Sequence, residues 1–217
     1  MMPMFKFFFI ILFVSLTILN SASAEKIVVF EFTDEEKKTL KVHKIKKETT
    51  YTLGSNENGN YLKAEAEGKA SGLGKDVKIN LLKTPFINIT WKIEQDLNGI
   101  NEQSKKGHDY AARVFVIKKT GVTALSNRAI NYVFSSNNPI GNHWRSPFTK
   151  KSIDYVLSTT QNNLNEWVTV KANVRKHFKK FYDIDVNEIE GVAIMTDTDN
   201  SKLSAIAYYQ NIYFSSE

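Results

Sequence analysis

The chain contains no cysteine among its 217 residues. Disulfide bonds, thiol nucleophiles and cysteine-bound metals are therefore excluded. Proline is also scarce, with four residues, and no proline-rich or serine-rich linker divides the chain. We therefore predict a single domain over residues 25–217. A domain of this length can bury about 70% of its extended-chain surface, so its core can hold it together without disulfides.

Long apolar runs are absent after the N-terminal segment. There, Lys6 precedes an apolar run that continues to Leu19, and small residues follow up to Ala24. This order is typical of a secretory signal peptide. The apolar run of about 13 residues is shorter than the roughly 20 that span a bilayer. We expect residues 1–24 to be removed, the mature protein to be periplasmic or secreted, and no transmembrane anchor to remain.

Sequence signatures of several common activities are also missing. The four histidines show no metal-binding spacing, and no Gly-x-Ser-x-Gly elbow surrounds Ser71. The net charge is a modest +6, and basic residues gather at 37–47 and 176–180. Such clusters form solvated surfaces or attract anionic partners. Because no nucleic-acid-binding motif accompanies them, we exclude nucleic acid as a partner.

Alternating apolar residues are the main pattern that is present. In Phe86–Glu94 the residues Ile87, Ile89, Trp91 and Ile93 share one face, which predicts a strand with one buried side. About ten such segments, separated by turns, predict an all-β protein. Helical spacing appears only near residues 173–182. We predict a β-sandwich of the jelly-roll type, with an open β-barrel as the alternative.

The C-terminal 24 residues to Phe214 predict two strands joined by an acidic turn. In the first, Val192, Ile194 and Thr196 share a face; in the second, Ile206, Tyr208, Ile212 and Phe214 do. The segment between them is rich in Asp, Asn and Ser, which favour turns. We therefore predict a β-hairpin over residues 191–214.

Several segments resemble the bacterial domain-of-unknown-function family 3047. They are Lys106–Val116, Asn131–Ser135, Glu166–Val170 and Gly191–Asn200, with further similarity in Lys63–Leu73 and Trp91–Ile93. The resemblance extends over roughly residues 50–214 and implies export and a common fold, but no activity. In the family pattern, two acidic residues stand where this chain has His108 and Asp109.

The last strand is more distantly similar to that of galactose-binding-like jelly rolls, which include many carbohydrate-binding modules. In those proteins, an acidic pair in this strand helps to hold a structural calcium ion. Here Gln210 and Asn211 take its place. Because both side chains are neutral, the resemblance does not imply that metal, and no cofactor is predicted from it.

Arg113 is an arginine in the middle of a predicted strand. An unpaired buried charge is prohibitive, so it must pair with an acid or line a groove. Asp109 is about 13 Å away along an extended chain. We therefore predict a partner on another strand, with Asp197 as the leading candidate. If this face is open, Arg113, Asp109 and Tyr132 would line a binding groove.

Asp197 and Asp199 would lie about 6.5 Å apart on one face of an extended chain. Three roles fit them: capping the turn, contacting a ligand, or holding a calcium ion, which requires several oxygen ligands. The long segment 136–149 contains Trp144 and Phe148 among amide and hydroxyl groups. This composition suits sugar binding, although Trp144 could equally close one end of the sandwich.

Three functional hypotheses follow. The first is an exported, non-catalytic domain that binds a glycan or another cell-envelope component through Asp109, Arg113, Tyr132, Trp144 and Asp197. The second is a polysaccharide hydrolase or lyase, with Asp109 or Asp197 as acid or base and His108 or His143 as its partner. The third is a structural or assembly protein of the envelope.

Overall fold

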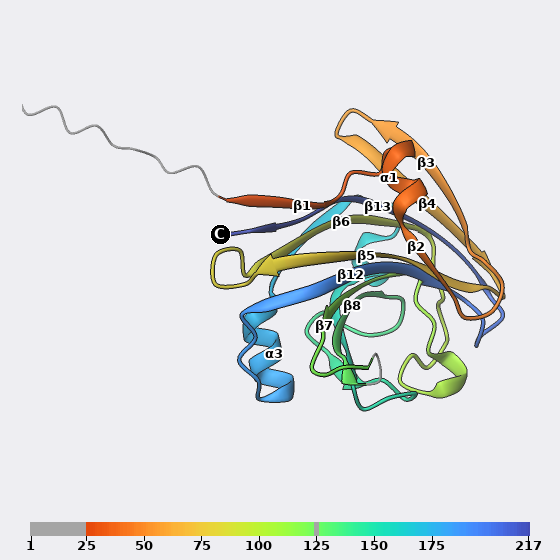
Figure 1. Ribbon diagram of the computed structural model, residues 1–217. Coiled ribbons are helices and arrows are strands. Elements are labelled where there is room, and N and C mark those ends of the chain that lie inside the picture. Colours follow the sequence, from red (N-terminus) through yellow and green to blue (C-terminus); the bar gives the residue numbers. More distant parts are fainter. Residues whose placement is uncertain (1–24, 124–125) are drawn as a thin grey trace, which may run out of the picture.

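The computed structural model describes residues 25–123 and 126–217, so the predicted signal peptide lies outside the described residues. An antiparallel β-sheet that contains β6 and β13 packs face to face against a mixed β-sheet that contains β5 and β12 (Figure 1). This arrangement confirms the predicted all-β sandwich. No helix in the described part of the chain has the length and apolar character needed to cross a bilayer.

Sheet A has six strands in the order β11-β6-β13-β4-β3, with β1 also paired to β13. Their bounds are β1 Lys26–Phe30, β3 Thr50–Asn56, β4 Gly59–Glu67, β6 Phe86–Gln95, β11 Val168–Asn173 and β13 Ser204–Ser215. Sheet B has seven strands in the order β2-β5-β12-β7-β8-β10-β9. Their bounds are β2 Lys41–Lys44, β5 Ala70–Asn80, β7 Ala112–Lys118, β8 Arg128–Ser135, β9 His143–Arg145, β10 Ser152–Thr159 and β12 Glu188–Asp197.

The core between the sheets is formed by the alternating residues of both layers. On β6, Ile87, Ile89, Trp91 and Ile93 are all fully buried, as predicted. On β12, Val192 and Ile194 face the same core from the other sheet. Burial of apolar surface at about 25 cal/mol per Å² is the main source of stability in a domain without disulfides.

Helices are short and peripheral. The predicted helix is α3, Val174–Tyr182, which begins where the Asn173 side chain accepts a hydrogen bond from the Lys176 N–H. Two further helices, α1 (Asp34–Thr39) and α2 (Thr160–Asn163), and a 3₁₀ turn, η1 (Lys105–Gly107), were not predicted. Helices of four to six residues are not stable alone, so these depend on tertiary contacts.

The predicted C-terminal hairpin is wrong. β12 pairs with β5 and β7 in sheet B, whereas β13 pairs with β4, β6 and β1 in sheet A. The intervening turn therefore carries the chain from one layer to the other. A hairpin and such a crossover have the same local pattern, because in both cases each strand buries one face.

The predicted common face of Ile206, Tyr208, Ile212 and Phe214 is also wrong. Ile212 and Phe214 are fully buried, while Ile206 and Tyr208 point away from the core and are partly exposed. The pairing register of β13 shifts between Gln210 and Tyr213, around Asn211, whose φ is 48°. A bulge of this kind exchanges the two faces of the strand.

A half-buried histidine makes the stability of this fold depend on pH. His177 Nδ1 lies 3.0 Å from the Tyr132 hydroxyl, and burial, assisted by Lys180 and His143, lowers the pKa of His177 to about 4. The unfolded chain takes up this proton near pH 6.5. The stability contributed by neutral His177 is therefore complete above pH 6.5 and lost as the pH falls towards 4.

Between pH 7.5 and pH 4.5, we expect the free energy of unfolding to fall by about 2 kcal/mol less in His177→Gln than in the wild type. This figure is smaller than the full pKa shift would give, because the ring is partly exposed. Urea denaturation at both pH values measures it. His43→Gln, at an exposed histidine, is the control and should keep the wild-type dependence. An unchanged pH dependence in His177→Gln would contradict the assignment.

Candidate functional site

A cavity of about 320 Å³ lies on the face of sheet B that points away from sheet A. Its floor comes from β7, β8 and the end of β12, and its walls come from the segments around β2, η1, β9 and the β12–β13 turn. The lining residues are Ile45, His108, Arg113, Phe115, Asn131, Ser146, Phe148, Thr149, Ser152, Asp197, Asp199 and Asn200. The cavity thus combines exposed apolar groups at its rim with buried polar groups at its floor.

Arg113 is paired with Asp197, as predicted from the sequence. A terminal nitrogen of the Arg113 guanidinium donates to the Asp197 carboxylate on the neighbouring strand, and both side chains are almost completely buried. The guanidinium also lies 5.2 Å from the ring centres of Tyr110 and Phe115. Such contacts stabilise a desolvated cation, so the guanidinium is held in one orientation at the cavity floor.

The charges of this pair are shifted by burial and by their neighbours. Burial raises the pKa of Asp197 to about 7, with Arg113 opposing the shift and Asp109 adding to it. Burial disfavours the charged form of Arg113, but Asp197 and Asp154 outweigh this effect and raise the pKa of Arg113 above its usual value. Arg113 is therefore a cation at all physiological pH values.

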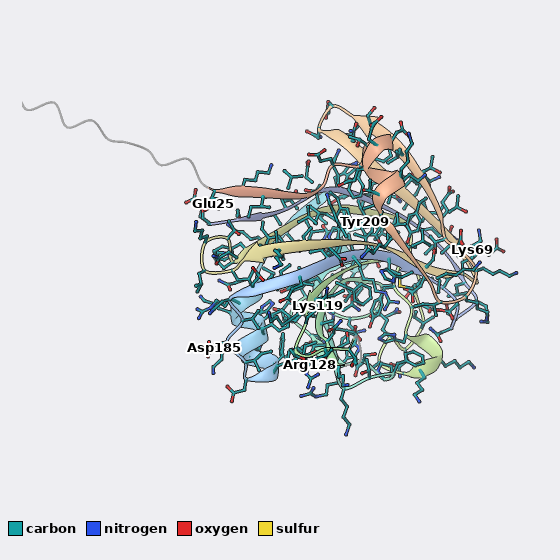
Figure 2. The ribbon with its side chains drawn as sticks, in the orientation of Figure 1. Glu25, Lys69, Lys119, Arg128, Asp185 and Tyr209 are labelled. Atoms are coloured by element: carbon teal, nitrogen blue, oxygen red, sulfur yellow. The ribbon has the colours of Figure 1, made fainter. Side chains whose placement is uncertain are left out.

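A tyrosine from the other sheet supports the floor from below. Tyr209, labelled near the middle of the molecule in Figure 2, is fully buried on β13. Its hydroxyl donates to the Met195 carbonyl at 2.7 Å and accepts from the Arg113 N–H at 3.3 Å. Thr196 Oγ1 is a further partner at 2.9 Å. The position of Arg113 thus depends on contacts between the two sheets.

Asp109 is fully buried beside the cavity and holds the β12–β13 turn. Its carboxylate accepts hydrogen bonds from the Asn200 side chain, at 2.8 Å, and from the Asn200 and Ser201 N–H groups. It thereby places Asn200, which lines the cavity. The structure assigns Asp109 a positioning role for this turn.

Carboxylate oxygens of Asp109, Asp197 and Asp199 all lie within 4.8 Å of one another. This spacing is compatible with ligands of one hard cation. However, Asp109 already accepts from the turn backbone and Asp197 already pairs with Arg113. Two of the three carboxylates are therefore already engaged, and the calcium ion considered from the sequence stays a prediction.

Three buried residues form a second polar group at the floor. His108 Nε2 lies 2.8 Å from Asp154 Oδ2, and the Asn131 amide N–H donates to Asp154 Oδ1 at 2.5 Å. Asp154 and Asn131 are fully buried, and His108 is nearly so. His108 also contacts the ring of Phe148, 5.5 Å between centres. Asp154 therefore orients both His108 and Asn131 towards the cavity.

Three residues predicted for the groove do not line the cavity: Asp109 lies behind it, and Tyr132 and Trp144 lie elsewhere. Tyr132 points into the core between the sheets, because side chains alternate along β8 and its neighbour Asn131 takes the cavity face. Trp144, on β9, packs against Tyr110, Val133 and Val156 and does not line the cavity. The segment that contains Trp144 does reach the cavity, through Ser146, Phe148 and Thr149.

Sequence reasoning missed Asn131, Asp154 and Phe115. Asn131 and Asp154 are each the lone strongly polar residue within an apolar strand segment, 129–134 and 153–157. That signal, the same one that identified Arg113, was available. Phe115 lacks that polar signal, but it lies two residues from Arg113 and therefore on the same face of the strand.

Comparisons with known proteins agree with the fold and identify the family. A family 30 carbohydrate-binding module of Clostridium thermocellum has a TM-score of 0.52 at 8% identity, with 89% of this chain and 98% of that chain covered. A xyloglucanase domain from Sinorhizobium fredii gives 0.46 at 10% identity, covering 81% and 92%. A cellulase derived from Rhodothermus marinus gives 0.47 at 10% identity, covering 81% and 90%.

The first of these likenesses shows a shared β-sandwich fold. Among curated proteins, none matches this chain in sequence. The sequence resemblance noted above is confirmed by a family model that matches residues 35–213. The chain therefore belongs to the family described as protein of unknown function DUF3047.

Proposed function

We propose that the protein is exported and binds a glycan in the cavity on sheet B, without catalysing its cleavage. The observation that carries this proposal is the composition of the cavity. Phe115 and Phe148 offer aromatic surface, and Asn131, Asn200 and Arg113 offer hydrogen-bonding groups. Sugars are recognised by this combination, because their C–H faces pack on aromatic rings while their hydroxyls bind polar side chains.

The size of the cavity and the fold support the proposal. About 320 Å³ lies at the lower end of the range for small-molecule sites, roughly 300–1,000 Å³. One solved structure with a TM-score above 0.5 is a carbohydrate-binding module. A shared fold alone does not establish a shared ligand, so the proposal depends chiefly on the cavity. Export is supported by the signal-like segment 1–24, and cleavage after Ala24 would leave β1 intact.

Phe148→Ala is the direct test. We expect residues 25–217 to bind oligosaccharides in calorimetric titration, and the variant to bind about two- to tenfold more weakly, because an aromatic contact contributes about 0.5–1.5 kcal/mol. Phe148 is 56% exposed, so stability should be unchanged. Ile140→Ala, equally exposed at 58% but outside the cavity lining, is the control.

Absence of binding across a broad panel of neutral and acidic oligosaccharides would overturn glycan binding. Equal effects of the two variants would place binding elsewhere on the surface. N-terminal sequencing of protein recovered from the medium or periplasm tests export, with Glu25 as the expected first residue.

Hydrolysis is the second candidate, and the raised pKa of Asp197, about 7, is the observation that favours it. Asp199 is its close carboxylate neighbour. Both acids, however, come from the same end of β12, whereas a glycosidase needs carboxyl groups on opposite sides of the scissile bond. Product formation from a bound oligosaccharide, lost in Asp197→Asn, would establish hydrolysis instead of binding alone.

A further inference from the structure

Two buried polar atoms at the cavity floor have no hydrogen-bond partner among the described residues. They are Arg113 Nε, a donor, and Asn131 Oδ1, an acceptor. Arg113 is 4% exposed and Asn131 is fully buried, and both line the cavity. A buried polar atom without a partner is destabilising, because it has lost its hydrogen bonds to water. Their location therefore points to a ligand that supplies both an acceptor and a donor.

Both atoms are held in place by acids behind them. Asp197 binds the terminal nitrogen of Arg113. Asp154, whose carboxylate can only accept, takes the amide N–H of Asn131, so the amide oxygen must point the other way. Groups fixed before binding lose little conformational entropy when a ligand arrives. The floor is thus preorganised to present one donor and one acceptor.

The two groups are diagonal neighbours on adjacent strands. Arg113 pairs with Val133, and Asn131 pairs with Phe115, in the antiparallel register of β7 and β8. Diagonal side chains on one sheet face start about 7 Å apart at their Cβ atoms, within reach of a shared small ligand. Two neighbouring hydroxyls of a pyranose offer an acceptor and a donor side by side. A single hydroxyl or a lone carboxylate offers a poorer match to this pair.

Charge at the cavity disfavours acidic sugars. Asp197 and Arg113 neutralise each other, which leaves Asp199 in the lining and Asp109 directly behind it as the acidic groups. At the rim, Lys202 Nζ is bound to the Asp199 backbone oxygen, and Lys202 does not line the cavity. Like charges brought together at an interface weaken binding. A uronate or sulfated sugar would meet this repulsion, whereas a neutral sugar would not.

We propose that the cavity binds a neutral pyranose through a vicinal diol, with one hydroxyl accepting from Arg113 Nε–H and its neighbour donating to Asn131 Oδ1. This inference rests on the proposed glycan-binding function and names its ligand class. Phe115 and Phe148, which also line the cavity, supply the apolar contact for the sugar ring. Asn131 is then the residue that selects for a hydroxyl donor.

Calorimetric titration of residues 25–217 with matched neutral and acidic oligosaccharides tests the inference, for example oligogalactosides against oligogalacturonides. Wild-type protein should bind the neutral series at least tenfold more tightly. Asn131→Leu should lose at least tenfold in affinity for the neutral ligand, since it removes the acceptor. Asn60→Leu, at an exposed site on sheet A, should bind as the wild type does.

A ligand with its hydroxyls O-methylated controls for misfolding of Asn131→Leu. It should bind the wild type more weakly than the free sugar, yet bind the variant and the wild type about equally, because the donor and its acceptor act together. Tighter binding of the acidic series, or an undiminished affinity in folded Asn131→Leu, would overturn the neutral-diol inference and leave glycan binding standing. Absence of binding to every oligosaccharide would overturn the proposed function itself.

Discussion

Arg113→Met is expected to lower the free energy of unfolding by about 3–5 kcal/mol at pH 8, because it leaves the buried Asp197 carboxylate without its cation. The loss should be smaller at pH 5. Burial already raises the pKa of Asp197 to about 7 while Arg113 holds it down, so removing Arg113 raises it further. In the unfolded chain this carboxyl titrates near 3.9.

The sign of the pH effect follows from these two values. The folded variant binds a proton at a pH where the unfolded chain does not, so its stability rises as the pH falls through the raised pKa. Urea denaturation at pH 8 and pH 5 measures both effects. Arg145→Met, at an exposed arginine, is the control and should change stability by less than about 1 kcal/mol. A loss that is equal at the two pH values would contradict the buried ion pair.

A double variant separates the pair from its surroundings. Arg113→Met combined with Asp197→Leu removes both charges, so it should be more stable at pH 8 than Arg113→Met alone. The recovery is expected to be incomplete, because Asp197 also accepts from the Tyr110 N–H. If the two single losses simply add, the side chains do not interact.

Trp91→Ala is expected to destabilise the protein by about 3–5 kcal/mol, the range for removing a large buried aromatic side chain. Trp91 is fully buried on β6, and its ring packs against Phe134 with 5.4 Å between centres. Its indole N–H donates to Ser158 Oγ on β10 at 2.9 Å. The residue therefore joins the two sheets through both packing and a hydrogen bond.

Chemical denaturation of Trp91→Ala, Trp91→Phe and Trp167→Ala resolves these contributions. Trp91→Phe keeps most of the packing but leaves Ser158 without its donor, so a loss of about 1–3 kcal/mol is expected. Trp167 is partly exposed and lies outside the core, and its replacement should have the smallest effect. Similar losses in Trp91→Ala and Trp167→Ala would contradict the role of Trp91 in joining the sheets.

A side chain of β13 links the core between the sheets to the floor of the cavity. Tyr209 reaches from sheet A to the backbone of Arg113 and Met195 on sheet B. Arg113 in turn presents its Nε at the cavity floor. A substitution that alters the spacing of the sheets would therefore displace the groups proposed to bind sugar. Binding measurements on core variants should therefore be accompanied by measurements of their free energy of unfolding.

The Arg113–Asp197 pair was predictable from the sequence, whereas the orientation of the Tyr132 side chain was not. A charge inside an apolar strand needs a partner wherever the strand lies, so the pair follows from electrostatics alone. The orientation of Tyr132 depends on which face of β8 meets the core. Residues 130–136 are all buried, because the loop that carries Tyr110 and strand β9, which carries Trp144, cover the outer face. With both faces covered, alternation cannot identify the inner one.

The sequence determined four features: the strand content, the inward faces of β6 and β12, the helix at 174–182 and the need for a partner to Arg113. Each of them depends on local periodicity or on the burial of one residue. The tertiary structure decided which strands are neighbours, because the backbone N–H and C=O groups are the same in every strand and do not specify a partner. It thereby placed β12 and β13 in different sheets and introduced the bulge at Asn211. It also brought Asn131, Phe148 and Asp197, distant in sequence, to one cavity.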